Sequence, residues 1–289
     1  MGKKLFEATF EESQSINPNL FSKNIPISYN LGPSREKMIS RILDIIPYIF
    51  VSVISYALGV GLPETASDGT IKFGLKDIWF GTSEFNYFKF LILGVIILWG
   101  LMICINIIPK PNYSIIRMFE VANLFFMILL MDFAMLPMLL GTTLGATGWL
   151  GFIIICIYGI TFFVSSIQSK AQKIKQEMFG DHMKIKLNYS MKIWSALKKI
   201  WVIPFGLILI NIFTFRLGMR GSFSLWSFVW IFAGPIYFGI LTLFSAGPMK
   251  LFVSSFYFAK YAEQYRALWS LTDEQWYGKR KSKNIKKKK

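Results

Sequence analysis

Long apolar blocks separated by shorter polar segments dominate this chain of 289 residues. Five blocks reach the roughly 20 residues that a helix needs to cross the hydrocarbon core of a bilayer, which is about 30 Å thick, and a sixth comes close. The pattern predicts an all-α integral membrane protein with six transmembrane helices. The predicted spans are residues 42–62, 88–108, 118–140, 149–168, 200–217 and 225–246.

The connectors between these blocks differ in length. Residues 109–113, 141–148 and 220–224 are short, which predicts antiparallel helical hairpins. The longer connector 169–199 contains the sequence KIKLNYSMKIWSALKKIW, in which apolar residues recur at helical spacing while lysines occupy the other side. Such a segment is typical of an amphipathic helix that lies at the membrane surface.

The segment after the sixth predicted span has features of its own. Gly247 and Pro248 are expected to break the helix, and the stretch LFVSSFYFA that follows is too short to cross a bilayer. We expect this stretch to lie along the inner headgroup layer and to place three tyrosines at the interface. The capping-box pattern TDEQ then predicts one last short helix. The three tyrosines are Tyr257, Tyr261 and Tyr265.

Composition agrees with a membrane location, and charge orients the chain. Hydrophobic residues make up 54% of the sequence and charged residues 17%, against roughly 25% charged in soluble domains. The net charge is +16, and 27 of the 32 lysines and arginines fall in segments that share a side with the N-terminus. Basic residues accumulate in cytoplasmic segments. We therefore predict a cytoplasmic N-terminal segment (1–41), a six-helix transmembrane domain (42–246) and a cytoplasmic tail (247–289).

Asp132 is the sharpest candidate for a functional side chain, because it lies deep in the third predicted span. An acidic residue at that depth is expected to face the bundle interior, where it pairs with a cation or polar group or holds a proton. One interpretation is a proton or cation relay, and the other is a structural hydrogen bond between helices. Arg216, near one end of the fifth span, is a possible partner.

Other polar and small residues inside the spans favour helix packing. Asn106, Asn123 and Asn211 are expected to form hydrogen bonds between helices. Ser55 and Gly59 have the small-xxx-small spacing that lets two helices approach closely. Arg117 and Glu120 can pair on one helical face, because they are three residues apart.

The C-terminal sequence KRKSKNIKKKK is strongly basic, with eight basic residues in eleven. Such a cluster beside a membrane binds anionic lipid, at about 1 kcal/mol per basic residue. Contact with RNA phosphates is the alternative, but base-stacking residues are lacking, so specific nucleic acid recognition is not expected. The predicted lipid-binding residues are Lys279, Arg280, Lys281, Lys283, Lys286, Lys287, Lys288 and Lys289.

Enzymatic signatures are not found in the sequence. It lacks HExxH, GxSxG and phosphate-binding loop patterns, and Cys104 and Cys156 have no metal-ligand spacing. We therefore expect no catalytic residues, metal or cofactor. The function predicted is a membrane subunit of a transport or export system that needs a protein partner. The alternative is an accessory or protective membrane protein, linked to toxin immunity or secretion. The Lys-, Ile-, Asn- and Phe-rich composition favours a bacterial cytoplasmic membrane.

Overall fold

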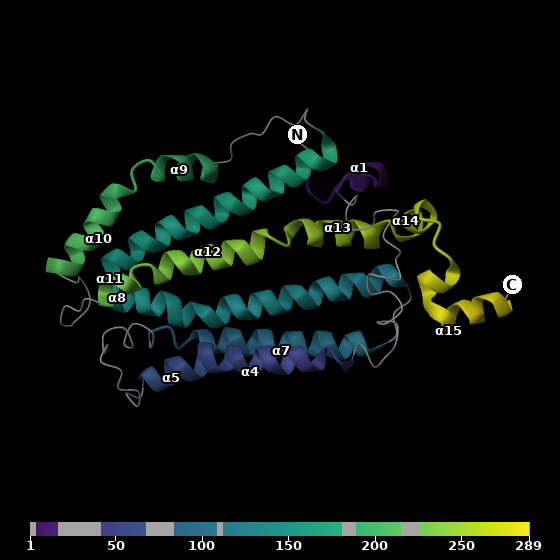
Figure 1. Ribbon diagram of the computed structural model, residues 1–289, viewed down its shortest axis with the longest axis horizontal. Helices are drawn as coiled ribbons and strands as arrows, with labels where there is room; N and C mark the ends of the chain where they lie inside the picture. Colours follow the sequence, from purple (N-terminus) through teal and green to yellow (C-terminus); the bar gives the residue numbers. More distant parts are fainter. Residues whose placement is uncertain are drawn as a thin grey trace.

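A computed structural model of the protein describes residues 4–16, 42–67, 84–108, 112–180, 189–214 and 226–288. Every regular element in these ranges is a helix, and the long helices lie side by side along the longest axis of the molecule (Figure 1). The elements are α1 (Phe10–Gln14), α4 (Ile45–Tyr56), the π-helix η2 (Ala57–Gly61), α5 (Leu62–Ser67), α7 (Phe88–Ile107), α8 (Tyr113–Phe179), α9 (Tyr189–Leu197), α10 (Val202–Thr214), α11 (Trp226–Trp230), α12 (Ala233–Ala246), α13 (Met249–Lys260), α14 (Ala262–Leu268) and α15 (Asp273–Lys288).

Four helical stretches in the described residues are long and apolar enough to cross a membrane. They are Ile45–Thr65, Phe88–Ile107, Tyr113–Phe179 and Ser227–Lys260. A fifth is added if α9 and α10, which are bent by 63° relative to each other, count as one span. The all-α prediction is therefore confirmed. These stretches overlap every predicted span, and α8 contains two of the predicted spans, 118–140 and 149–168.

The helix α8 reverses its direction at Gly148. Its first half runs along the middle of the molecule, and its second half returns antiparallel to it (Figure 1). Gly148 has φ 66° and ψ 177°, and the positive φ is a conformation that favours glycine. The Thr143 and Thr147 hydroxyls donate to Leu139 O and Thr143 O, each at 2.8 Å. Residues 141–148, predicted to be a connector, are thus buried and helical up to this one glycine.

The helices α12 and α13 follow one line on either side of Gly247 and Pro248 (Figure 1). Gly247 and Pro248 both keep right-handed helical backbone angles, so the chain direction is maintained across the interruption. Lys250 of α13 also pairs with Glu177 of α8 at 2.6 Å. The stretch therefore extends α12 along the returning half of α8. The helix is interrupted at Gly247 and Pro248, as predicted, and the position of this stretch along the inner headgroup layer stays a prediction.

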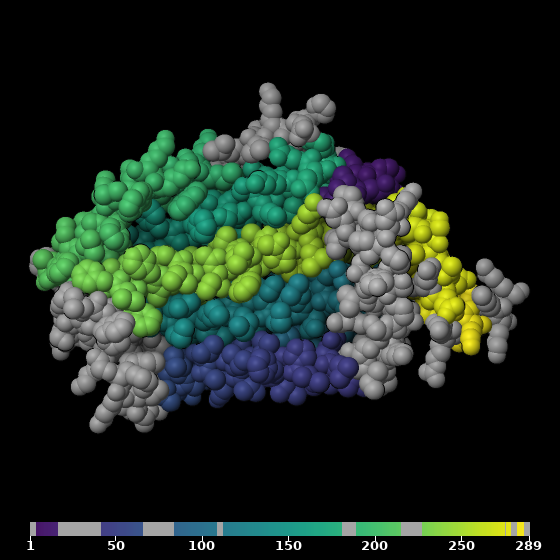
Figure 2. Space-filling model, in the orientation of Figure 1, coloured from purple at the N-terminus to yellow at the C-terminus, as the bar shows by residue number. Residues whose placement is uncertain are grey.

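Apolar clusters join the helices in pairs and threes. One cluster fastens η2, α7 and the first half of α8 through Val60, Ile92 and Leu130. Another fastens the second half of α8 to α10 and α11. In the space-filling view, α4, α8 and α12 form adjacent bands across one face (Figure 2). Large apolar side chains such as Phe50 and Phe90 are exposed on outer surfaces, as expected of helices whose solvent is lipid.

Candidate functional site

Asp132 lies in the first half of α8 and is 3% exposed. Its neighbours on the same helix, Leu130 and Ala134, are completely buried. The Oδ1 atom has no hydrogen-bond partner among the described residues. The carboxyl group is therefore enclosed between helices, as the sequence predicted for an acid at this depth.

The π-helix η2 packs against α8 beside Asp132. A Cβ atom added to Gly59 would lie 3.0 Å from Ala134 Cα and 2.4 Å from the Ile92 side chain, so only glycine permits this approach. Ser55, one turn earlier, donates to the Met131 sulfur at 3.8 Å. Ser55 and Gly59 thus both face α8. A π-turn inside an α-helix is uncommon and frequently marks a functional site.

The three asparagines singled out in the sequence each bond to a different part of the fold. Asn106 Nδ2 donates to Asp44 Oδ2 at 3.4 Å, which ties the end of α7 to the residue before α4. Asn123 Oδ1 accepts from the Trp99 indole at 2.5 Å.

The third amide, Asn211 of α10, donates to Thr147 O at the reversal of α8. All three bonds connect separate helices, and none of them brings an amide to Asp132.

Asp44 is a buried polar residue that the sequence analysis missed. It is 7% exposed and precedes α4, where it receives the bond from Asn106. Its position inside residues 42–62, just before the first helical turn, was the available signal, because Asp is common in front of helices. Arg216, the proposed partner of Asp132, lies outside the described residues.

The helix α1 meets α13 and α14 in a contact that we call the terminal latch, which is made by residues 5–13 and by Tyr257, Tyr261 and Tyr265. The Tyr257 hydroxyl accepts from Ala8 N at 2.9 Å and donates to Leu5 O at 2.8 Å. Tyr261 donates to Ala8 O at 2.7 Å.

The third tyrosine of the latch, Tyr265, shares a 2.8 Å hydrogen bond with Ser13 Oγ. The rings of Tyr261 and Tyr265 also contact Phe10 edge-on. Tyr257 and Tyr265 are completely buried. The N-terminal segment therefore covers Tyr257 and Tyr265, so the expectation that they face the membrane interface is wrong for these two, whereas Tyr261 is partly exposed.

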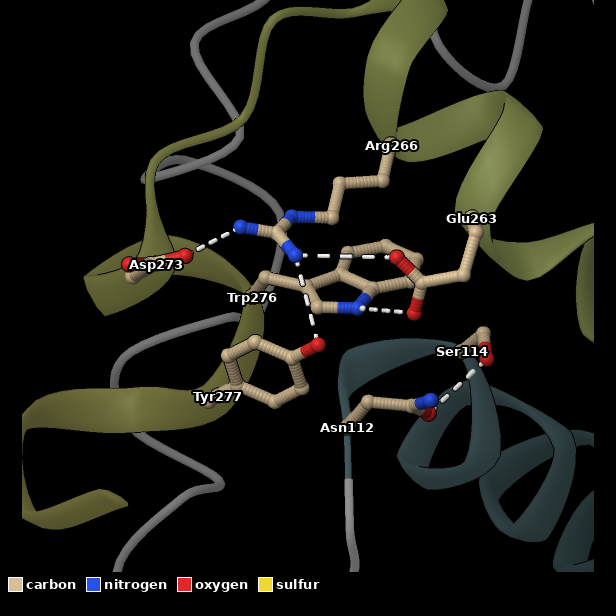
Figure 3. A network of polar contacts seen from close by, with 7 residues as sticks. All are labelled: Asn112, Ser114, Glu263, Arg266, Asp273, Trp276 and Tyr277. Atoms are coloured by element: carbon tan, nitrogen blue, oxygen red, sulfur yellow. Dashed lines mark hydrogen bonds and ion pairs between the residues drawn. The ribbon is translucent and has the colours of Figure 1, made fainter. Parts of the chain in front are cut away.

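A second polar network fixes α15 against α14 (Figure 3). Arg266 pairs with Asp273 and with Glu263, the latter at 3.6 Å, and it donates to the Tyr277 hydroxyl at 3.2 Å. The Trp276 indole donates to Glu263 at 3.4 Å. The helix predicted from the TDEQ pattern does begin at Asp273, and this network anchors its first turn.

The polybasic sequence begins directly after a break in this last helix. Gly278 has a positive φ of 82°, so the chain changes direction behind the anchored Trp276. Among the eight predicted lipid-binding residues, the structure describes only the side chain of Lys283, which is exposed. Near the start of α8, Arg117 pairs with Glu120 at 2.9 Å, as predicted.

No group of three or more His, Cys, Asp or Glu that could hold a metal occurs in the described part of the chain. Cys104 and Cys156 are free. The long apolar helices and their exposed apolar surfaces have the character of a polytopic integral membrane protein. Comparison with protein families, with characterised proteins and with solved structures finds no match.

Proposed function

We propose that the chain crosses the membrane six times with both ends in the cytoplasm and serves as a membrane subunit of a transport or export system. Six crossings result if α8 counts as two spans separated by Gly148 and if α10, which follows the interfacial helix α9, counts as the fifth. The arrangement of helix ends supports this count. The N-terminal segment, the end of α7 and helices α13 to α15 gather at one end of the molecule (Figure 1).

Reporter fusions test this topology. Fusions after residues 75, 145 and 221 should report the outside, and fusions after residues 112 and 180 should report the cytoplasm, as should a fusion after residue 285. A single exchange between the two sets would contradict six crossings.

The transport proposal depends on one observation, the buried Asp132 carboxyl whose Oδ1 has no hydrogen-bond partner in the described residues. An acidic side chain inside a membrane domain that has no hydrogen-bond partner marks a path for protons or cations more often than it serves helix packing alone. A helix contact based on hydrogen bonding would give the carboxyl a donor, as Asn211 and Asn123 have partners. Asp132 is thus assigned the binding of a proton or cation.

A hydrophobic carbodiimide tests this assignment, because it reacts with protonated carboxylic acids inside apolar surroundings. Wild-type protein in membranes should be modified at Asp132, as read by peptide mass spectrometry, and Asp132→Asn should lose that adduct while keeping its abundance. Asp44→Asn is the matched control, because Asp44 is buried but accepts a hydrogen bond; its substitution should leave the adduct on Asp132 unchanged.

The rival function, an accessory or protective membrane protein, is favoured by the apolar surroundings of Asp132. Leu130, Ala134 and Leu140 are buried on the same helix, and these neighbours do not form a polar path. Under this alternative Asp132 serves packing. Absence of an adduct at Asp132, together with loss of the protein from membranes in Asp132→Leu, would support the alternative over transport.

A further inference from the structure

A large apolar cavity lies between the returning half of α8, the bend from α9 to α10, and α12. Its volume is about 390 Å³, within the range of roughly 300 to 1,000 Å³ that is usual for ligand sites. Tyr158 and Phe162 line it from α8, Trp194 and Trp201 from the bend, and Phe238 from α12.

The cavity is a consequence of how these helices meet. Phe238 packs where a side chain on Gly159 would be, because a Cβ there would lie 2.0 Å from the ring, so α12 approaches α8 closely at that point. The bend of 63° turns α9 out of line with α10. The Tyr158 hydroxyl donates to Leu197 O at 3.3 Å, and this bond fixes the end of α9 against α8.

The charged residues of the described segment 189–214 are all basic. Lys198 and Lys199 are exposed in the turn between Trp194 and Trp201, the two tryptophans that line the cavity. The sequence of residues 189–214 contains no acidic residue, and neither does that of residues 149–168 or of α12. Trp201 is 55% exposed and follows Lys198 and Lys199 by two to three residues. An exposed indole is typical of the headgroup level of a membrane. The apolar cavity thus opens next to a basic surface at that level.

We propose that this cavity binds an anionic phospholipid, with one acyl chain inside the cavity and the headgroup phosphate at Lys198 and Lys199. The apolar lining matches a hydrocarbon chain, and the two lysines match the negative headgroup. Each basic residue near an anionic lipid strengthens binding about fivefold. The site is separate from Asp132 and from the polybasic tail.

Photocrosslinking tests the proposal on the full chain in vesicles. Two phospholipids carry the same photoreactive acyl chain, one with an anionic glycerol headgroup and one with a neutral choline headgroup, at equal mole fraction. Peptides that contain Tyr158, Phe162 and residues 201–208 should be labelled at least fivefold more by the anionic lipid. Lys198→Gln with Lys199→Gln should remove this preference.

Two matched controls separate the cavity from the general lipid surface. Ile154→Trp adds bulk inside the cavity and should lower labelling by the anionic lipid at least fivefold, whereas Ile153→Trp, on the exposed neighbouring position, should not change it. Lys170→Gln with Lys173→Gln, two and five residues beyond residue 168 on α8, should keep the preference for anionic lipid. Thermal unfolding of each variant shows that it is folded.

Equal labelling by the two lipids, or undiminished labelling of Ile154→Trp, would mean that the cavity holds ordinary bulk lipid, and the proposal would be wrong. Crosslinks from the cavity to a second copy of the chain would assign it to an interface between subunits and would equally overturn the lipid site. None of these outcomes depends on whether Asp132 carries a proton.

Discussion

The terminal latch predicts a large effect of removing one oxygen atom. Tyr257→Phe deletes a completely buried hydroxyl that accepts from Ala8 N and donates to Leu5 O. Both backbone groups lose their partner, and Ala8 is itself 1% exposed, so water does not readily replace the hydroxyl there. A buried backbone group without a partner costs about 1 to 3 kcal/mol. Two such groups together would cost about 2 to 6 kcal/mol. We take the lower end of this range, about 2 kcal/mol, as the expected loss in the free energy with which residues 5–13 dock.

Hydrogen exchange measured by mass spectrometry reports this loss directly. A change of about 2 kcal/mol corresponds to roughly a 30-fold increase in the fraction of undocked α1, and the amides of residues 8–14 should exchange faster by that factor. Tyr261→Phe removes one bond, to Ala8 O, and should give a smaller increase. Tyr277→Phe is the control, because its hydroxyl accepts a hydrogen bond from Arg266.

Unchanged exchange in Tyr257→Phe would refute the latch. The same conclusion would follow if residues 8–14 of the wild-type protein already exchanged at the rate of an unfolded peptide.

Two further predictions concern packing and charge. Gly159→Ala should lower the thermal unfolding temperature in detergent, because its Cβ would meet the Phe238 ring at 2.0 Å and such overpacking costs about 1 to 3 kcal/mol; Gly94→Ala, which meets nothing within 4 Å, should be neutral or slightly stabilising. A peptide of residues 270–289 should bind vesicles that contain anionic lipid and dissociate as salt is raised above about 0.1 M, where the Debye length falls below about 10 Å. Equal binding to neutral vesicles would contradict an electrostatic lipid anchor.

Local patterns predicted the helices well wherever the flanking residues are polar. Residues 88–108 were predicted as a span and Phe88–Ile107 is the observed helix α7, because apolar length is set by the bilayer and the sequence changes character at both ends. Asp132 was predicted to be buried on the same grounds. Burial follows from local apolar surroundings.

Contacts between distant segments could not be read from such patterns. The sequence GTTLGATG resembles a loop by composition, yet it is helical and buried, and two of its threonine hydroxyls bond back to carbonyls one turn earlier. The spacing of Tyr257, Tyr261 and Tyr265 does reveal one face of a helix. It does not reveal that Leu5 and Ala8 provide the bonding partners of that face, because the two segments are 249 residues apart in the case of Ala8 and Tyr257.

The same separation gives the terminal latch a place in biosynthesis. Ala8 is synthesised 249 residues before Tyr257. At about 5 to 20 residues per second, translation of the intervening chain takes roughly 12 to 50 s. During that time the N-terminal segment has no α13 to bind, although all the membrane helices before it are being synthesised. Docking of α1 therefore follows synthesis of α13. Protection of the Ala8 amide from hydrogen exchange thus marks a chain whose helices up to α13 have been made and assembled.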